Sequence, residues 1–599
     1  MCGIFGYVGT RDQAAQVVLA GLKKLDYRGY DSWGIATRRN GHAPASLLVD
    51  KRVGKIGQAT TSLPGSHTAL GHTRWATHGG VTEANAHPHI DCHGRVAVIH
   101  NGIVENHEEL RCELLLRGHT FRSATDSEVL AHMMEDELAR TDLRPSGERI
   151  LHALVRVFGR LEGLNAVGVL DRREQCIAVA KNGSPLVLGW GTDGNYLASD
   201  SSALLEHTQR LTFLQDGQAA LVMASEVSVY DMTTGDRLTD VEIVDVEWQE
   251  EQADLQGQPH YMAKEIHEQP RVLRRVAAEC AVGAQALADM IDSAGTVHLV
   301  GCGSASHAAR AGEYLLSRIA HHQVTTVVGS EFSHLAHLLD HRSLVVGLSQ
   351  SGETIDLLDA MKTARSRGAR VTALVNVEGS SLFRLVEQPL LLRAGPERCV
   401  LATKSFTAKV GVLLMAAYAA GGAPELGRQL VECAADEIEA FLSDGRADQM
   451  RAIAERIYRR DHLYVIGRGP SYPLALEAAL KIKEVSYIHA EGFAGGELKH
   501  GVIALIEEGT PCLVLAPRDE TFRAIESAAQ EVKARGGYII GISPNPSGAW
   551  DEHIPVADVG DAAALVNAIP PQLLAYHLAL WRGLDPDKPR NLAKSVTVR

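Results

Sequence analysis

The second residue of the chain, Cys2, would carry both a thiol and a free α-amine if an aminopeptidase removed Met1. An α-amino group has an unperturbed pKa of about 8, so near neutrality it accepts the thiol proton directly or through a water molecule. Nucleophile and base would then belong to one residue. A cysteine at position 2 is more often accidental than catalytic, so this interpretation depends on the residues that accompany it.

Two later stretches place polar side chains where a buried strand would be apolar. The segment 71–79 combines a cation, a large ring, a hydroxyl and an imidazole, supplied by Arg74, Trp75, Thr77 and His78. In the segment 100–106, Asn101 and Gly102 follow the apolar run Val96–Ile99. An amide side chain and an unhindered N–H at the end of a strand are the donors that an oxyanion needs. An Asn-Gly pair is equally typical of a two-residue hairpin turn.

Six motifs occur in order over roughly the first 130 residues: CGIFGYVG, YRGYDSWGIA, GHTRWATHGG, NAHPH, HNGIVEN and TDSEV. Together they resemble the N-terminal-nucleophile glutaminase domain of the glutamine amidotransferases, and GSPLVLG follows behind them. The resemblance implies a four-layer αββα fold, in which antiparallel sheets pack face to face between helices. The segment 168–246 agrees with it, since short strands with glycine turns and little helix are predicted there.

The same resemblance assigns roles to individual residues. Cys2 would attack the side-chain amide carbon of glutamine, and its α-amine would relay the proton to the departing ammonia. Asn101 and the N–H of Gly102 would hold the oxyanion. Arg74 would grip the α-carboxylate of the substrate by a two-pronged contact, and Asp126 would bind the α-ammonium group. The residues expected to line the pocket are Arg28, Thr77, His78 and His87, with Trp75 as a ring that gates it.

Composition and charge exclude several classes of function. With 599 residues the chain is too long for one core, and about three to five domains are expected. A formal net charge of -14, without a basic stripe, argues against binding of nucleic acid. The 9 scattered cysteines form no CxxC pair, which predicts a reduced, cytoplasmic chain without disulfides or a metal site. No apolar signal region and no run of about 18 apolar residues is present, so no membrane contact is expected.

The second half of the chain contains a duplication. Residues 247–260 are charged and lack apolar periodicity, which predicts a linker. Beyond it, a strand, a glycine loop and a helix near Gly301 recur near Gly467, and a second set with Gly368 recurs with Gly536, about 166 to 168 residues later. Strands that alternate with helices predict parallel-sheet α/β domains, whose ligands bind at the carboxyl ends of the strands.

The first copy carries a pattern suited to phosphate between a strand and a helix. The stretch SQSGET supplies three hydroxyls and a glycine in six residues. Hydroxyls and N–H groups at a helix N-terminus donate to an anion that the helix dipole also favours, whereas simple N-capping needs fewer of them. The corresponding loop of the second copy, 516–521, has lost the pattern and gained acidic residues. One phosphate site in the chain is therefore expected.

The second copy carries a charged helix instead. The helical pattern from Leu474 to Val485 places Glu477, Lys481 and Glu484 near one face. A solvated, ion-paired face is the ordinary interpretation of such spacing. The tail 590–599 follows a proline-rich segment and is of a kind that usually frays.

A pair of sugar-isomerase (SIS) domains behind such a glutaminase resembles the glutamine:fructose-6-phosphate amidotransferases, also called glucosamine-6-phosphate synthases. The resemblance covers essentially the whole chain, including SQSGET, ATKSFT, ALKIKEVSYIHAEG, GELKHG and PRNLAKSVTV. It implies synthesis of glucosamine 6-phosphate and glutamate from fructose 6-phosphate and glutamine, at the entry to hexosamine formation. Ring opening, ammonia addition at C2 and a proton shift between C1 and C2 need acid and base groups but no metal or redox cofactor.

The family builds its sugar site from a homodimer. Glu484 matches the base that moves the proton between C1 and C2, and His500 of the partner subunit matches the ring-opening residue. Lys594 matches a tail lysine that engages the open-chain ketone as a Schiff base. The residues that match the sugar-phosphate site are Cys302, Gly303, Ser304, Ser349, Gln350, Ser351, Thr354, Glu397, Val400 and Lys481.

Two departures from the family pattern keep other interpretations open. Ala305 stands where the family has a hydroxyl, and the stretch 396–402 differs from the usual one. Both are compatible with a paralogue that aminates another keto-sugar phosphate. A phosphosugar-binding regulator that has kept the fold is an alternative of a different class, and the intact catalytic residues argue against it.

The predicted organisation has five parts. They are a glutaminase domain over 1–246, a linker over 247–260, a first SIS domain over 261–440, a second SIS domain over 441–585, and a tail over 586–599 that closes the sugar site.

Overall fold

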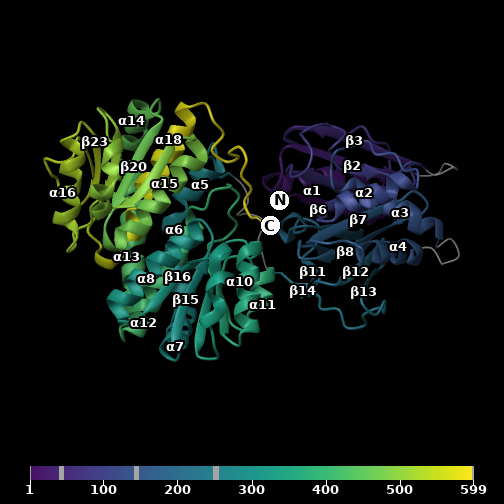
Figure 1. Cartoon of the computed structure of the whole chain (residues 1–599), viewed down its shortest axis with the longest axis horizontal. Coiled ribbons are helices and arrows are strands. Elements are labelled where there is room, and N and C mark those ends of the chain that lie inside the picture. Colours follow the sequence, from purple (N-terminus) through teal and green to yellow (C-terminus); the bar gives the residue numbers. More distant parts are fainter. Residues whose placement is uncertain (1, 40–45, 141–146, 247–254, 597–599) are drawn as a thin grey trace. The chain divides into compact units, whose positions relative to one another are not determined.

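The computed structural model describes residues 2–39, 46–140, 147–246 and 255–596. The chain divides into two compact units (Figure 1), one of residues 1–251 with 593–599 and one of residues 252–592. The predicted linker falls at this division, and its residues 247–254 lie outside the described part.

Two antiparallel sheets form the centre of the N-terminal unit. Among the described residues, the first sheet has eight strands in the order β14 (Val244–Asp245), β11 (Arg210–Phe213), β9 (Val187–Trp190), β10 (Gly194–Ala198), β1 (Gly3–Gly9), β4 (Thr68–Arg74), β2 (Ser32–Arg38) and β3 (Leu47–Val53). The second, counted over the same residues, has six in the order β13 (Val227–Asp231), β12 (Gln218–Met223), β8 (Cys176–Asn182), β7 (Asn165–Asp171), β6 (Val96–Gly102) and β5 (His89–Ile90). The helices of this unit include α1 (Ala14–Lys24), α2 (His107–Leu116), α3 (Glu128–Arg140) and α4 (Glu148–Phe158).

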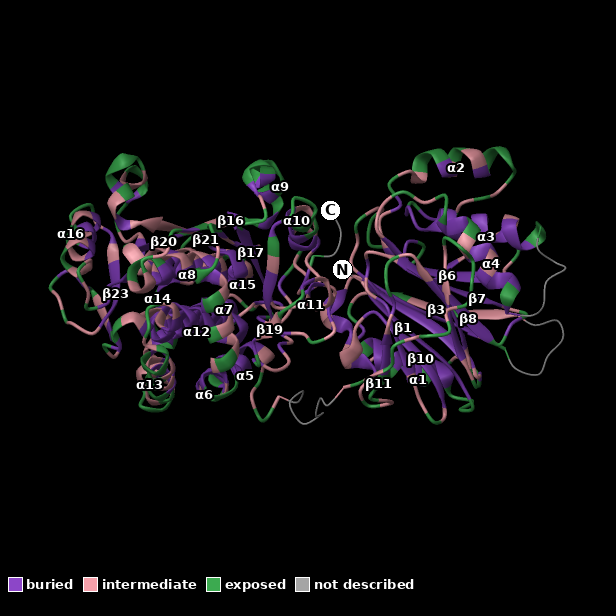
Figure 2. Cartoon of the chain, turned by 90° about the horizontal axis from the view of Figure 1, so that it is seen from below, coloured by how far each residue is buried: buried purple, intermediate pink, exposed green. Residues whose placement is uncertain are grey.

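The layers follow from the alternation of side chains along the strands. In β1, Phe5 and Tyr7 join the core with α1, whereas Ile4 and Val8 join the core between the two sheets. β6 alternates in the same way between the inter-sheet core and the core with α3 and α4. These two central strands are accordingly buried on both faces (Figure 2), and the predicted αββα glutaminase fold is confirmed.

The Asn-Gly pair is part of a strand and not a hairpin turn. β6 runs through both residues and pairs Asn101 with Ala166 and Gly102 with Asn165 of β7. Gly102 has a φ of 138°, and a Cβ atom there would lie 2.2 Å from the Leu164 carbonyl oxygen. A side chain at position 102 would therefore strain the end of the strand.

The C-terminal unit contains the duplication as two parallel sheets. Within the described residues, each sheet has five strands. The order in the first copy is β16 (Val324–Val328), β15 (Thr296–Gly301), β17 (Ser343–Ser349), β18 (Arg370–Val375) and β19 (Pro389–Leu391). The order in the second copy is β21 (His489–Ala494), β20 (His462–Gly467), β22 (Pro511–Leu515), β23 (Tyr538–Ser543) and β24 (Glu552–Pro555). The first strand of each copy lies between the second and the third, so the predicted repeat of a doubly wound α/β domain is confirmed. Gly303 and Gly469 take φ values of 54° and 56° at equivalent turns after that strand.

Helices surround both sheets. Those of the first copy include α5 (Tyr261–His267), α6 (Gln269–Glu279), α7 (Ala281–Asp292), α8 (Ser304–Ala320), α9 (Phe332–Leu335), α10 (Ile355–Ser366), α11 (Ser381–Leu385), α12 (Lys404–Ala420) and α13 (Pro424–Ser443). Those of the second include α14 (Arg446–Ile457), α15 (Tyr472–Ser486), α16 (Phe522–Lys533), α17 (Ala563–Val566) and α18 (Ile569–Trp581). One apolar core joins α8 and α12 of the first copy to α15 and α18 of the second.

The helical stretch 560–581, which ends with α18, is long and apolar enough to cross a membrane by length and composition, with a mean hydropathy of 1.2. Most of that stretch, 78%, is buried inside the unit. Leu574 and Leu578 belong to the apolar core shared by the two copies. The burial is that of a core helix.

Candidate active sites

Cys2 is positioned by β1, which lies between β4 and β10 in the eight-stranded sheet. The Gly3 N–H donates to Thr73 Oγ1 at 3.1 Å, and the Ile4 N–H donates to Ser199 Oγ at 3.0 Å. Two neighbouring strands thus fix the main chain directly after the nucleophile. Cys2 as a residue is partly exposed.

The end of β4 contacts the thiol. Cys2 Sγ accepts the Trp75 N–H at 3.2 Å. Asp31 holds this segment, because its Oδ2 accepts the Ala76 N–H at 2.7 Å and its N–H donates to the Arg74 carbonyl at 3.0 Å. Burial raises the pKa of the Cys2 thiol, while the Trp75 N–H and the Arg74 charge act in the opposite direction. A base is therefore required for Cys2 to react as a thiolate at neutral pH.

Asn101 reaches Cys2 from the other sheet. Its Nδ2 donates to the Cys2 carbonyl oxygen at 2.9 Å, and its Oδ1 lies 3.1 Å from His72 Nε2. Burial lowers the pKa of His72 to about 3, so the imidazole is neutral at physiological pH. His72 Nε2 also faces the His100 carbonyl oxygen at 3.0 Å, and two acceptors require that Nε2 carry the hydrogen. This hydrogen sets the amide orientation of Asn101, with Nδ2 toward Cys2, as an oxyanion donor requires.

Arg74 and Arg28, both predicted to bind glutamine, are buried. Nη2 of Arg74 donates to the carbonyls of His78 at 2.5 Å and Gly79 at 3.0 Å, which shapes the turn after β4. Arg28 donates to Asp200 Oδ2 at 2.7 Å. Each guanidinium group thus has partners within the protein, and contacts with glutamine stay predictions.

The other predicted glutamine binders lie at different depths. Asp126 is buried, and its Oδ2 accepts the Val104 N–H at 2.8 Å just beyond β6. The buried ring of His87 packs against His72 with 4.1 Å between centroids, so it supports the residue that orients Asn101. Thr77 is exposed and His78 is partly exposed.

Asp31, His72 and Thr73 hold this site together, and the sequence assigned none of them a role. All three lie inside the quoted motifs. A motif match indicates that a segment belongs to a functional site, but it does not show which polar group contacts which neighbour. The available signal was the occurrence of two polar residues, His72 and Thr73, in a strand that is buried throughout.

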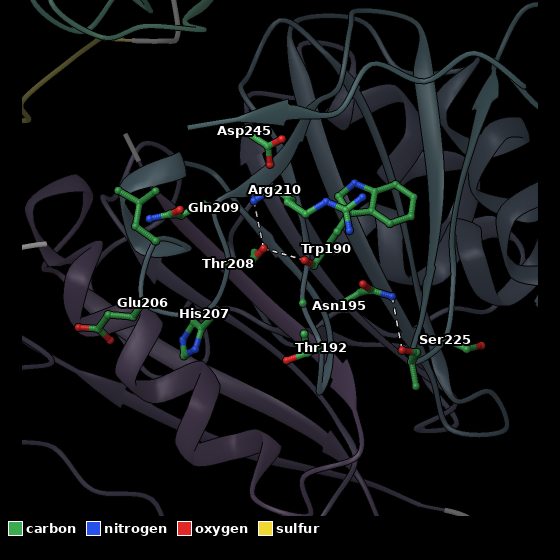
Figure 3. A pocket seen from close by; sticks show the side chains of 13 residues that line it. Trp190, Thr192, Asn195, Glu206, His207, Thr208, Gln209, Arg210, Ser225 and Asp245 are labelled. Carbon is green, nitrogen blue, oxygen red and sulfur yellow. Dashed lines mark hydrogen bonds between the residues drawn. The ribbon is translucent and has the colours of Figure 1, made fainter. Parts of the chain in front are cut away.

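A cavity of about 570 Å³ lies elsewhere in this unit, against β9, β10 and β11 (Figure 3). Its lining includes Trp190, Glu206, His207 and Arg210. Thr208 Oγ1 donates to the Trp190 carbonyl at 2.6 Å and accepts the Arg210 N–H at 3.1 Å. The predicted site residues are not among those that line it, so it is assigned to neither half of the expected reaction.

The second site is a cluster of charges between α8 and α15. Lys481 Nζ donates to Ser304 Oγ at 2.9 Å. The same Nζ lies 2.7 Å from Glu484 Oε2 and 3.4 Å from Glu477 Oε1. Glu477 Oε2 in turn lies 2.9 Å from His307 Nδ1. Because Ser304 and His307 come from one copy and the charged residues from the other, the cluster joins the two halves of the duplication.

Burial of this cluster overturns the expectation of a solvated face. Lys481 and Glu477 are each 1% exposed, whereas the Glu484 side chain is 19% exposed. Burial disfavours the charge of Lys481, but Glu477 and Glu484 outweigh it and raise the pKa of Lys481. Burial likewise acts against Glu477, but the Lys481 charge prevails and lowers its pKa. Glu484 is the carboxylate of the cluster that a ligand can reach.

The stretch Ser349–Thr354 connects β17 to α10. Ser349 Oγ accepts the Gly352 N–H at 2.9 Å, which closes the loop. Gly352 has a φ of 68°, and a Cβ atom there would lie 2.0 Å from Ser380 Oγ. Thr354 is the N-cap of α10 but makes no side-chain cap bond, so N-capping does not account for this hydroxyl. The partly exposed polar side chains of the loop are Gln350, Ser351, Glu353 and Thr354, of which Glu353 accepts hydrogen bonds from Ser381.

The turn before α8 contains the first departure from the family pattern. Cys302 is partly exposed, and burial raises the pKa of its thiol to about 11, so it is neutral. Gly303 is exposed, and Ser304 begins the helix. Ala305 and Ser306 are buried, with 9% and 7% exposure, so the departure lies in the packed first turn of the helix.

The second departure surrounds Glu397. Its Oε1 accepts the N–H groups of Thr403 and Ser405, both at 3.0 Å, which caps α12. The Val400 N–H donates to the Asp587 carbonyl at 3.2 Å. The unusual segment therefore packs against the chain that leads to the C-terminal tail, and a role in binding the sugar stays a prediction for both residues.

His500 and Lys594 lie in segments of the chain other than α8 and α15. His500 ends the 3-10 helix η7 (Gly495–His500) and is exposed. Lys594 belongs to the residues that group with the N-terminal unit. The roles predicted for both residues stay predictions.

The domains match two known family models. Residues 57–256 match the glutamine amidotransferase domain, and residues 290–419 and 456–582 match the SIS domain. The glutamine–fructose-6-phosphate aminotransferase (isomerizing) of Pyrococcus horikoshii is 41% identical over 611 residues and covers 100% of both chains. This chain belongs to that family. The aminotransferase of the same name from Thermus thermophilus is 42% identical over 630 residues, again with 100% coverage of both chains.

Solved structures agree with membership of the aminotransferase family. The C-terminal domain of the glucosamine-fructose-6-phosphate aminotransferase of Francisella tularensis is 29% identical, with a TM-score of 0.53 over 56% of this chain and 100% of its own. The tagatose-6-phosphate ketose/aldose isomerase of Escherichia coli, 18% identical with a TM-score of 0.50, covers 56% of this chain and 97% of its own and shares the fold. As a member of this family, the chain is an enzyme with a glutamine-hydrolysing part and a sugar-phosphate isomerase part.

The substitution Glu477→Gln is expected to lower the free energy of unfolding at pH 7 by about 3 kcal/mol, the range for breaking a buried ion pair. Lys481 would then keep its buried charge with Glu484 as its remaining carboxylate partner. Glu455→Gln is the matched control, because Glu455 is exposed on α14, and a change below about 0.5 kcal/mol is expected there. Thermal unfolding of the full chain measures both variants.

The difference in free energy of unfolding between the wild type and Glu477→Gln is also expected to become smaller at acidic pH. The pKa of Glu477 in the folded state lies below its usual value of 4.5. The contribution of the Glu477 charge to stability is therefore complete above pH 4.5 and is lost as the pH falls through the folded-state pKa. A difference that stayed constant from neutral to strongly acidic pH would contradict the ionic role of Glu477.

Proposed function

We propose that this chain makes glucosamine 6-phosphate and glutamate from fructose 6-phosphate and glutamine. One observation carries the proposal: each half of the reaction has its own set of positioned groups. Cys2 and Asn101 meet in the N-terminal unit, and Lys481 and Glu484 meet between the two copies of the C-terminal unit. Relatives named for this reaction align with the chain over its whole length.

In the first half-reaction, Cys2 Sγ attacks the side-chain amide carbon of glutamine. The α-amine that removal of Met1 exposes takes the thiol proton and delivers it to the leaving ammonia. Asn101 Nδ2 and the Gly102 N–H donate to the oxyanion of the tetrahedral intermediate. Water then hydrolyses the thioester, and glutamate leaves. Because His72 is neutral and holds the amide of Asn101, these donors are oriented before the substrate arrives.

The charges of the glutamine substrate are met by residues that are already positioned. Arg74 binds the α-carboxylate and Asp126 binds the α-ammonium group, and both side chains are buried. Thr77 and His78 line the approach. The main chain of Trp75 contacts Cys2 Sγ, and its ring covers the bound substrate.

In the second half-reaction, His500 of the partner subunit opens the sugar ring. Ammonia adds to C2 with loss of water, which produces an imine. Glu484 removes a proton from C1 and a proton is returned to C2, so that an aldehyde forms at C1 and an amine remains at C2. The contact of Glu484 with Lys481 at 2.7 Å sets the position of this carboxylate. The loop Ser349–Thr354 binds the phosphate group.

A homodimer completes the proposal. His500 is exposed at the end of η7, outside α8 and α15, which supports a role in the site of a partner subunit. Lys594 of the tail engages the open-chain ketone. The protein acts in the cytoplasm, where both substrates are small soluble metabolites, without nucleic acid or membrane as partner.

Glutamine labelled at the amide nitrogen, given with fructose 6-phosphate, is expected to yield labelled glucosamine 6-phosphate. Mass spectrometry detects the product and also establishes that Met1 is absent. Labelled product would establish both half-reactions and the transfer of ammonia between them. If glutamate formed without amino sugar, the sugar substrate would be another keto-sugar phosphate. A panel of ketose phosphates would then identify it. If neither glutamate nor amino sugar formed, the proposal would be overturned.

The variant Cys2→Ala is expected to lose glutamine hydrolysis and to keep ketose-to-aldose isomerisation. The reason is that Cys2 supplies the nucleophile for glutamine but lies in the glutaminase unit and takes no part in the proton shift of the sugar. Cys112→Ser is the matched control, since Cys112 is exposed on α2. Glutamate release by Cys2→Ala at a rate close to that of the control would contradict the assignment.

Glu484→Gln and His500→Ala are each expected to stop product formation while sugar-phosphate binding stays measurable. Chains of the two variants, unfolded together and refolded as a mixture, should regain about a quarter of the wild-type rate, because half of a random mixture is mixed dimers with one intact site. The intact site combines Glu484 of one chain with His500 of the partner subunit. If the mixture contained mixed dimers but the rate of product formation did not recover, His500 would act in the site of its own chain.

A further inference from the structure

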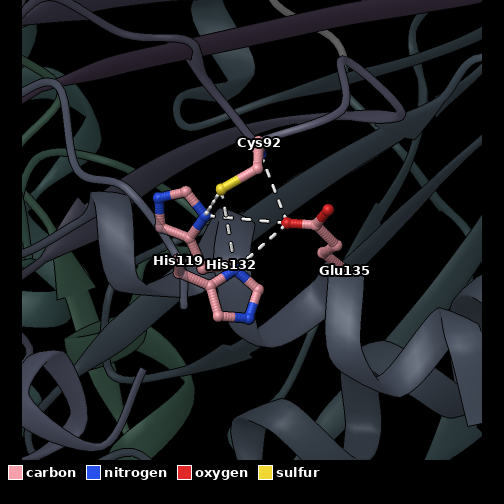
Figure 4. A group of neighbouring side chains, drawn as sticks. All are labelled: Cys92, His119, His132 and Glu135. Carbon is pink, nitrogen blue, oxygen red and sulfur yellow. Dashed lines mark hydrogen bonds and ion pairs between the residues drawn. The ribbon is translucent and has the colours of Figure 1, made fainter. Parts of the chain in front are cut away.

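Four potential metal ligands converge at one point of the N-terminal unit (Figure 4). Cys92 lies in the turn between β5 and β6, and His119 follows the end of α2. His132 and Glu135 lie one turn apart on α3. One ligand atom from each residue lies within 4.8 Å of the other three. These residues belong to neither candidate active site.

The distances between the ligand atoms match the edges of a tetrahedron around zinc. With zinc bonds of about 2.3 Å to sulfur and about 2.0 to 2.1 Å to nitrogen or oxygen, the edges are about 3.6 Å for S···N and about 3.3 Å for N···O. Cys92 Sγ lies 3.7 Å from His119 Nδ1 and 3.5 Å from His132 Nδ1. Glu135 Oε2 lies 3.2 Å from His119 Nδ1 and 3.8 Å from His132 Nδ1.

A carboxylate behind the His119 imidazole orients it as a metal ligand, and a second carboxylate lies near His132. His119 Nε2 lies 3.0 Å from Asp136 Oδ1, so Nε2 carries the hydrogen and Nδ1 presents its lone pair to the cluster. His132 Nε2 lies 3.6 Å from Glu128 Oε1, which is beyond hydrogen-bond distance. A carboxylate on the far nitrogen of a histidine is the usual arrangement around bound zinc.

Charge and burial favour a divalent cation over a network of hydrogen bonds. A thiolate and a carboxylate balance the two charges of Zn²⁺, and the thiol proton is released to solvent when the ion binds. The side chains of His132, His119 and Glu135 are 1%, 9% and 12% exposed, whereas Cys92 is partly exposed. Glu135 also accepts the Cys92 N–H at 3.2 Å and contacts His93 through its other oxygen. The sulfur and imidazole ligands select zinc over magnesium or calcium, which prefer oxygen.

We propose that Cys92, His119, His132 and Glu135 bind one zinc ion in a closed structural site. The ion ties three segments together: the β5–β6 turn, the end of the α2–α3 connection and α3. Glu128, behind His132, also accepts the N–H groups of Arg122 at 2.8 Å and Ser123 at 2.7 Å. The site thereby stabilises the connection that ends near Asp126.

The sequence predicted no metal because the chain has no CxxC pair, whereas these ligands are spread from 92 to 135 in three segments. The detectable signal was the pair His132 and Glu135 at a spacing of three on a helix, which is frequent without a metal. Convergence of the other two ligands required the fold.

The test measures metal in the full chain, expressed without a polyhistidine tag in zinc-supplemented medium and dialysed against a weak chelator. Mass spectrometry of the metal content is expected to find about one zinc per chain in the wild type and in Cys112→Ser. Cys92→Ser and His132→Ala are expected to retain less than about one tenth of that amount. Cys112 is a matched control because it is an exposed cysteine of the same unit.

A spectroscopic measurement keeps the proposal testable if the ligand variants fail to fold. Zinc is removed with a strong chelator from a chain that carries both Cys2→Ala and Cys112→Ser, so that the other accessible thiols of this unit do not contribute, and cobalt(II) is added. Intense visible absorption of a tetrahedral ion and a thiolate-to-cobalt charge-transfer band are expected, both displaced by one equivalent of zinc.

Three outcomes would overturn the proposal. They are a wild-type chain without zinc after this purification, a cobalt spectrum of an octahedral ion without a thiolate band, and equal zinc retention in Cys92→Ser and Cys112→Ser. Iron or nickel held in place of zinc and lost in Cys92→Ser would overturn the identity of the ion.

Discussion

A charge removed from water needs an opposite charge or several hydrogen bonds close to it, and this constraint determines the arrangement around both candidate sites. Lys481 is the clearest case, because its ammonium group is 1% exposed and contacts Glu477, Glu484 and Ser304. Two of these partners lie on its own helix, and the third lies on a helix of the other copy. A shift between the two copies would leave a buried hydroxyl or a buried charge without its partner.

The two copies of the duplication share a fold but differ in the polar residues that they carry. The first copy retains the hydroxyl-rich loop Ser349–Thr354 at the carboxyl end of a central strand, where a parallel sheet binds its ligands. The second copy has lost that loop and supplies Lys481 and Glu484 from α15. A phosphate held by one copy and a proton-transferring carboxylate held by the other would act on opposite ends of the same sugar.

In the N-terminal unit the sheets perform the same positioning for a different reaction. The main chain after Cys2 is bound to Thr73 and Ser199, and Asn101 approaches from the second sheet. Because strands in packed sheets shift very little, Cys2 and Asn101 keep their relative geometry without help from a ligand. His72 is buried and neutral, and its tautomer determines the orientation of the Asn101 amide.

Local sequence determined the αββα unit and the repeated parallel α/β copies, because periodicity, glycine turns and ordered motifs are properties of short segments. The same motifs also predict the nucleophile and the phosphate loop. Local sequence did not show that Glu477 and Lys481 are buried, since helical spacing is the same for a solvated face and for a core face. It also missed His72 and Asp31 as supports of Asn101 and Cys2, and the convergence of Cys92 with three residues far along the chain. Only the tertiary structure decided these points, because contacts between segments distant in sequence depend on how sheets and helices pack and not on any one segment.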